Sequence, residues 1–125
     1  MNRPSSWPTA LGLLFVAGCA SLPTGLGPVR PGTLADGIYR GSARQSIVKE
    51  TVEVTVHGGR VTDVAVVGGF ASWIGRRAER VVPQRIVERQ STDVDGVTGA
   101  TASSRAIMLA TQRALEQAAS RRPAP

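Results

Sequence analysis

The chain has one cysteine and one histidine among its 125 residues. A single cysteine excludes an internal disulfide framework, a C-x-x-C redox pair and a c-type haem attachment site. The two residues together also leave too few ligands for a structural zinc site, which takes four N or S atoms. A Ser-His-Asp triad would have to use His57, and the neighbouring Gly58 and Gly59 are typical of a solvated turn instead.

Aromatic residues are also scarce, at 4% of the chain, while basic residues exceed acidic ones by 15 to 9 and give a net charge of +6. A high pI suggests nucleic acid or an acidic membrane surface as a partner. However, the arginines between positions 76 and 89 alternate with Glu79 and Glu88, and no basic stripe carries the aromatic residues that single-strand binders use for stacking. We therefore expect no nucleic-acid binding and interpret these charges as a solvated helix face.

Long apolar runs are absent, because the run from Thr9 to Gly18 is about half of the roughly 20 residues that a membrane-spanning helix needs. With Arg3 as the only charge among the first 29 residues, residues 1–18 have the pattern of a secretory signal peptide. Val16-Ala17-Gly18-Cys19 resembles the bacterial lipobox, which implies lipidation of Cys19 and cleavage before it. An incidental cysteine in an ordinary signal peptide is the alternative. Acyl chains would anchor the exported protein without a transmembrane helix.

Residues 19–34 are rich in proline and glycine and show no hydrophobic period, which predicts a tether behind the lipidated cysteine. Residues 35–122 form the predicted domain. Its core is thin for its size, so that a bound cofactor would add noticeably to stability.

Three strands are predicted in the first half of this domain. Residues 38–44 form the first strand, and residues 48–57 alternate between valines and polar residues with the period of two of a half-buried strand. Gly58-Gly59 is a hairpin signal, because both glycines tolerate a positive φ. Residues 61–67 are the return strand, and Gly68-Gly69 is expected to end it.

Helices are predicted to cover one face of this sheet. Apolar residues recur at helical spacing between Ser72 and Arg89, where Pro83 is expected to begin a new helix because proline breaks a helix interior. Residues 103–119 predict a final helix with a small-residue face that can pack closely on the sheet. The fold class is therefore α+β, with a small antiparallel sheet of three or more strands and helices packed on one face.

A turn rich in small and hydroxyl-bearing residues runs from Asp95 to Ser104 and leads into this last helix. Small residues let a ligand approach the backbone, and free N–H groups at a helix start favour phosphate. Simple helix capping by Thr98 or Thr101 is the competing interpretation. The segment is neither a P-loop nor a dinucleotide-binding fingerprint, because it lacks the Gly-Lys-Ser/Thr sequence and the preceding strand.

Asp95-Gly96-Val97-Thr98-Gly99-Ala100-Thr101 resembles the flavinylation motif of the FMN-binding domain family, which includes the periplasmic domains of the sodium-translocating NADH:quinone reductase and of a related ferredoxin-dependent complex. The resemblance extends to Asp36-Gly37-Ile38-Tyr39-Arg40-Gly41, the glycine hairpin and the closing helix. Thr98 stands where serine is more usual, and Ser103 where a second threonine is often found. Because the chain lacks the membrane helices of the quinone-reductase subunits, a stand-alone lipoprotein is expected.

The resemblance implies FMN bound covalently, through a phosphoester to Thr101. It also implies a separate flavin transferase that uses FAD and Mg²⁺, because a threonine hydroxyl is a weak nucleophile. Gly99 and Ala100 would keep the loop small, Asp95 would organise the turn or assist within the transferase, and Thr98 and Ser103 would bond the phosphate. The candidates to flank the flavin ring, each with core packing as the alternative, are Tyr39, Phe70 and Trp73.

An extracytoplasmic electron carrier between a membrane-bound or periplasmic donor and acceptor is the function that these expectations favour, since the cofactor does the hard chemistry. A non-redox lipoprotein module in which the motif only caps a helix is the alternative. A reductase with its own substrate is a weaker third interpretation, because no residue set for substrate reduction stands out.

Overall fold

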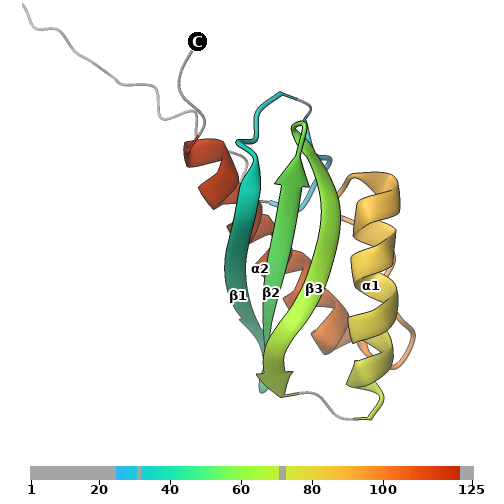
Figure 1. Cartoon of the computed structure of the whole chain (residues 1–125). Helices are drawn as coiled ribbons and strands as arrows, with labels where there is room; N and C mark the ends of the chain where they lie inside the picture. Colours follow the sequence, from blue (N-terminus) through green and yellow to red (C-terminus); the bar gives the residue numbers. More distant parts are fainter. Residues whose placement is uncertain (1–24, 31, 71–72, 122–125) are drawn as a thin grey trace, which may run out of the picture.

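The structure, a computed structural model, describes residues 25–30, 32–70 (at Phe70 the backbone only) and 73–121. Three strands are followed by two helices, and the strands pair in their sequence order as an antiparallel sheet (Figure 1). The predicted α+β class is therefore confirmed. The elements are β1 (Gly37–Gln45), β2 (Val48–His57), β3 (Arg60–Phe70), α1 (Gly75–Arg89) and α2 (Thr101–Ser120).

The sheet has the predicted hairpin between β2 and β3. Gly58 and Gly59 adopt φ angles of 62° and 75°, which suit the twist of a two-residue hairpin turn. β3 is longer than predicted, because it continues through Gly68 and Gly69 and still pairs Phe70 with Lys49. The pairing of β2 with β3 shifts register at two places, each of which accommodates an extra residue in β3. The pairing therefore continues past the two glycines.

The core lies between the sheet and α2, which packs against β1 and β2. Val52, Val54 and Val56 of β2 are at most 2% exposed on the face toward the helices. Gly41 of β1 allows the closest approach, since a Cβ there would lie 2.0 Å from the carbonyl oxygen of Ala110. The predicted small-residue face of the last helix is confirmed, because four of its alanines are fully buried: Ala106, Ala110, Ala114 and Ala118.

α1 lies beside β3 and also contacts α2 (Figure 1). The prediction that Pro83 begins a new helix is wrong, because α1 runs through it without interruption. Proline has no N–H to offer the carbonyl of Glu79, but Val82, Pro83 and Ile86 are all buried, and this packing outweighs the lost helical hydrogen bond.

The N-terminal strap, which we define as residues 25–30 and 32–34, is attached to the domain rather than forming a tether. Pro28 makes a bridge to Ser91, the N–H of Val29 donates to the carbonyl of Gln90 at 2.7 Å, and the N–H of Thr92 donates to the carbonyl of Gly27 at 2.9 Å. Leu34 belongs to the core. The predicted start of the domain at residue 35 is therefore too late, because buried leucine and paired backbone fix the strap.

The predicted signal peptide and Cys19 lie outside the described residues. Within residues 25–30, 32–70 and 73–121, no helix is long and apolar enough to cross a membrane.

Candidate functional site

The turn from Asp95 to Ala100 connects the end of α1 to the start of α2. Gly99 has a φ of +84°, which glycine adopts without strain, and Ala100 is the residue that caps α2. No side chain makes a capping hydrogen bond there. The competing interpretation, in which Thr98 or Thr101 caps the helix, is therefore not supported, and the first N–H groups of α2 have no side-chain acceptor.

Ser104, one turn into α2, is hydrogen-bonded to the backbone of this loop. Its Oγ accepts a hydrogen bond from the N–H of Val97 at 2.9 Å, and Val97 is itself buried. A Cβ on Gly96 would lie 3.1 Å from the Cβ of Ser104, so the loop packs tightly on the helix that follows it.

Arg85 of α1 holds the same loop from the other side. Its Nη1 donates to the carbonyl oxygen of Asp95 at 2.7 Å and to that of Gly96 at 3.2 Å. The sequence analysis interpreted Arg85, like the other arginines of α1, as part of a solvated helix face. The signal was its position three residues after Val82 and one before Ile86, both buried, which puts Arg85 beside the buried face of the helix.

Four of the predicted cofactor-binding residues line one cavity of about 560 Å³: Asp95, Thr98, Gly99 and Thr101. This volume is within the usual range for small-molecule and cofactor sites. Thr101 is exposed at the first position of α2. The cavity is completed by Leu26 of the N-terminal strap, by the segment from Asp93 to Val97, and by Ser104, Arg105 and Met108 of α2.

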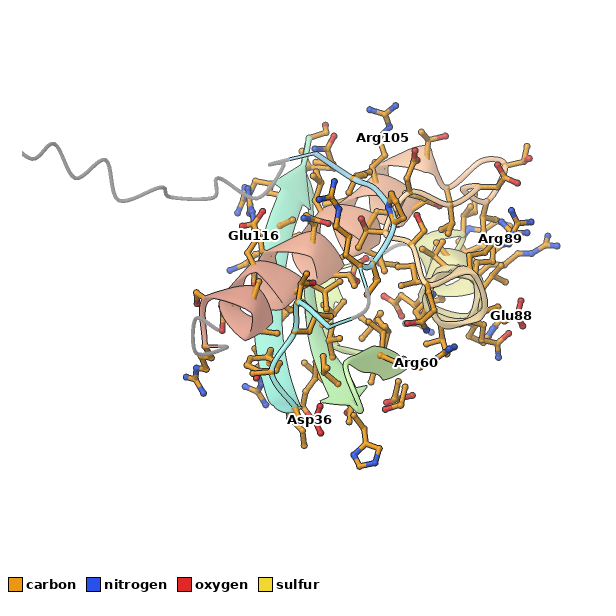
Figure 2. All side chains as sticks on the ribbon, turned by 90° about the horizontal axis from the view of Figure 1, so that it is seen from above. Asp36, Arg60, Glu88, Arg89, Arg105 and Glu116 are labelled. Atoms are coloured by element: carbon orange, nitrogen blue, oxygen red, sulfur yellow. The ribbon has the colours of Figure 1, made fainter. Side chains whose placement is uncertain are left out.

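Arg105 is a cavity residue that the sequence analysis missed. It follows Thr101 by four residues, so both side chains lie on one face of α2. In Figure 2 the Arg105 side chain points away from the body near the start of this helix. The signal was the i, i+4 spacing, which places a cation next to the predicted attachment point.

Ala100 and Ser103 do not line this cavity; both are buried, at 6% and 4% exposure. Ser103 follows Thr101 by two residues, about 200° around the helix, and therefore faces the core. The predicted hydrogen bond from Ser103 to a phosphate on Thr101 does not fit this placement.

Tyr39 is wrong as a candidate to flank a ring at Thr101. It is buried at the start of β1, its hydroxyl donates to the carbonyl of Ala35 at 2.7 Å, and its ring lies 5.6 Å from the guanidinium carbon of Arg121. Arg121 follows the far end of α2, about 30 Å along the helix from Thr101. Figure 2 shows Arg105 and Asp36, which is close to Tyr39 in sequence, on opposite sides of the molecule.

Trp73 lies at the correct end of the domain for a ring contact. It is 81% exposed and precedes Ile74, whose Cγ2 lies 3.8 Å from the position of a Cβ on Gly99. The side chain of Phe70 lies outside the described part of the structure. Trp73 is therefore the aromatic candidate that the geometry supports.

Glu50 is a buried carboxylic acid that the sequence analysis passed over. It is fully buried on the core face of β2, and within the described structure neither carboxyl oxygen has a hydrogen-bond partner. Burial, and secondarily the negative charge of Glu79, raises the pKa of Glu50 from 4.5 to about 7. The signal was the period of two, which puts Glu50 in phase with Val52, Val54 and Val56.

Metal binding by clustered side chains finds no support in the described residues, which include no group of three His, Cys, Asp or Glu side chains suited to an ion.

A model of the FMN-binding domain matches residues 49–116, which include 68 of the 125 residues. The chain belongs to the FMN-binding domain family. The match begins in β2 and ends in α2, so it includes the loop, Thr101 and every cavity residue except Leu26 of this FMN-binding domain.

The FMN-binding domain is similar to a protein of Treponema pallidum (strain Nichols) described as uncharacterized, with 40% identity over 92 residues. This alignment covers 70% of the chain but 24% of the relative, so the chain spans about a quarter of that protein. The fold is similar to the crystal structure of the CPE2226 protein from Clostridium perfringens, at a TM-score of 0.55 and 21% identity. That comparison covers 68% of the chain and 88% of the solved structure.

The residues at the cavity fit FMN chemically. Unpaired N–H groups at the start of α2 and the guanidinium of Arg105 suit a phosphate group. The apolar side chains of Leu26, Val94 and Met108 suit the less polar parts of the cofactor.

Proposed function

We propose that this flavoprotein is an extracytoplasmic electron carrier with FMN bound covalently to Thr101 through a phosphoester. One observation carries the proposal: Thr101 is exposed, its hydroxyl makes no capping bond, and it lines a cavity with the cation of Arg105. A threonine that served only as a helix cap would have its hydroxyl on a backbone N–H group.

The attachment reaction transfers FMN from FAD. The Thr101 Oγ1 forms a bond to phosphorus, the P–O bond to AMP breaks, and the hydroxyl proton leaves with the departing AMP or to solvent. An alcohol needs a strong base or a metal ion for this step, so we expect a separate flavin transferase with Mg²⁺. Gly99 keeps the loop narrow enough to enter the active site of that enzyme, and Arg85 keeps the loop in one conformation.

The chain then holds the phosphodiester electrostatically. Its negative charge would lie at the positive end of α2, next to the guanidinium of Arg105 one helical turn away. The carboxylate of Asp95, which lines the same cavity, would repel the phosphate, so we assign it to the loop or to the transferase reaction rather than to phosphate binding. FMN would supply the redox chemistry when bound, and Trp73, which precedes Ile74 beside Gly99, is our candidate to cover part of its ring.

A covalent bond suits a protein outside the cytoplasm, where a lost cofactor is not readily replaced. The lipobox at Cys19 would keep the domain at a bacterial membrane, close to a membrane-bound or periplasmic donor and acceptor. The described residues supply no set of groups for reducing a substrate, which favours a carrier over a complete enzyme. The alternative, a non-redox module in which the motif only caps α2, is less well supported because the hydroxyls do not cap.

Intact mass of exported protein, made together with an active flavin transferase, tests this proposal. We expect a gain of FMN less one water in the wild type and none in Thr101→Ala. Thr98→Ala is the matched control, because Thr98 is an exposed threonine of the same cavity and its loss should leave the flavin attached. An attached flavin in folded Thr101→Ala would show that another residue is the acceptor, and an unmodified wild type would favour the module.

A further inference from the structure

Glu50 is the one buried polar side chain in the described core whose polar atoms have no hydrogen-bond partner. Buried polar groups are nearly always hydrogen-bonded, so an exception needs an explanation. The fully buried side chain of Glu50 leaves both oxygens unpaired, and neither the loop nor the proposed attachment at Thr101 uses it.

The carboxyl of Glu50 lies against a strand backbone that carries no side chain. Gly69 of β3 is its cross-strand partner, and a Cβ on Gly69 would lie 2.5 Å from the Oε2 of Glu50. Gly69 itself is exposed. A proton therefore has a short distance to travel between solvent and the carboxyl, across a glycine rather than across a packed side chain.

Glu79 is the charged group that faces Glu50 from α1, and its charge disfavours ionisation. The partners on the neighbouring strands, Ala43 and Gly69, are uncharged. Gly41 of β1 lies against Ala110 of α2. The α2 residues beside Ala43 of β1 are therefore about one helical turn earlier, at Ala106 and Ile107. These residues are apolar as well, and no positive charge among them compensates an ionised Glu50.

Glu50 also lies at the same end of the domain as the attachment loop. Ile107 is six residues beyond Thr101, about 9 Å along α2. Glu79 is one turn into α1, whose start at Ile74 touches the loop at Gly99. A charge added near Thr101 would therefore act on Glu50 through a packed interior of low dielectric constant.

We propose that Glu50 is a proton-exchanging group coupled to the redox state of the flavin, and this inference rests on the proposed attachment at Thr101. Electrons from an outside donor go to the cofactor, and one proton from solvent binds a carboxylate oxygen of Glu50. On reoxidation the electrons go to an acceptor and the same proton returns to solvent. By linkage, protonation of Glu50 favours reduction to the same extent that reduction favours its protonation.

The test measures the midpoint potential of the flavinylated protein between about pH 5 and pH 9, with dithionite as the reductant. Wild type should have a steeper fall of potential with pH around neutrality than Glu50→Gln, in which the side chain cannot titrate. Glu53→Gln is the matched control, because Glu53 is on the same strand and pairs with Arg40 on the opposite face of the sheet. It should keep the wild-type slope.

Two further measurements guard against a folding artefact in Glu50→Gln. Reduced-minus-oxidised infrared spectra should show the carbonyl band of a protonated carboxylic acid in wild type and Glu53→Gln, and no such band in Glu50→Gln. Glu79→Gln leaves Glu50 in place, and it should move the steep region of the potential to lower pH because a repelling charge is lost.

Equal slopes in wild type and Glu50→Gln, without the infrared band, would overturn the inference, because the protonation of Glu50 would then not depend on the redox state of the flavin. That result in protein with one attached FMN would leave the proposed function intact. An unmodified wild-type mass would overturn the proposed function and the coupling together.

Discussion

Thr101 is exposed at the first position of α2, where the helix has N–H groups free to meet an anion. Ser103 carries the same kind of hydroxyl two residues later and is buried. Glu50 and Glu53 differ in the same way on β2, one fully buried and the other paired with Arg40 at the surface. At the scale of the residue, the phase within the helix or strand decides which of two similar side chains is available for chemistry.

The raised pKa of Glu50 predicts how stability depends on pH. Folded protein holds the Glu50 proton up to about pH 7, whereas the unfolded chain releases it near pH 4.5. The free energy of unfolding should therefore fall as pH rises through this window, by roughly 2–3 kcal/mol between pH 5 and pH 8. Urea unfolding of the unflavinylated protein at the two pH values measures this loss.

Glu50→Gln should remove that loss, so that its stability relative to wild type improves as pH rises. Glu53→Gln should behave like wild type, since its carboxyl is on the solvent face. Parallel pH profiles for wild type and Glu50→Gln would show that the carboxyl is solvated in the folded state.

At the scale of the element, α1 and α2 together give the loop its shape. α2 begins at the loop and ties it through Ser104, while α1 reaches it through Arg85. The position of α2 depends in turn on Gly41, because any larger residue would push the helix away from β1. The motif residues alone therefore do not define the site, since two helices and one strand hold them.

Arg85→Ala should slow flavin attachment without unfolding the domain. Hydrogen bonds from a charged group contribute about 1.5–3 kcal/mol, so loss of both should lower the rate of FMN incorporation by roughly tenfold or more. The mass change over time in the presence of transferase and FAD gives this rate. Arg89→Ala is the control, because Arg89 is an exposed arginine at the end of α1. A rate unchanged by Arg85→Ala would contradict the role of Arg85 in holding the loop.

At the scale of the whole molecule, the N-terminal strap joins the predicted anchor side of the chain to the flavin cavity. Thr92, just before the loop, bonds Gly27 of the strap and Gln112 of α2. Leu26 of the strap lines the cavity. The part of the chain that leads toward Cys19 is therefore also a wall of the site.

Truncation tests whether the strap belongs to the domain. A variant that starts at residue 25 should be as stable as the mature protein. A variant that starts at residue 35 should lose about 3 kcal/mol or more, because it lacks buried Leu34 and the packed side chains of Leu26 and Val29. Thermal unfolding of the two variants, both without flavin, compares them directly. Equal melting temperatures would show that the strap adds nothing to the fold.

The sequence by itself determined most of the secondary structure and the residue types of the motif. The period of two predicted the strand at residues 48–57, helical spacing predicted helical structure between Ser72 and Arg89 and at residues 103–119, and the glycine pair predicted the hairpin, because these patterns depend on which face of an element is buried. The resemblance to the FMN-binding domain family was also available in the sequence, since the motif is contiguous. Of the cofactor-binding residues named from the sequence, Asp95, Thr98, Gly99 and Thr101 line the cavity, whereas Ala100 and Ser103 do not.

Tertiary structure decided the rest, because it depends on contacts between residues far apart in the chain. Pro83 stays within α1 because it is buried together with Val82 and Ile86, and the strap belongs to the domain because Ser91 and Thr92 pair with it. Arg85 and Arg105 belong to the site because α1 and α2 both contact the loop between them. Glu50 was isolated in the core because packing removed water from a strand face that local sequence marks only by its period.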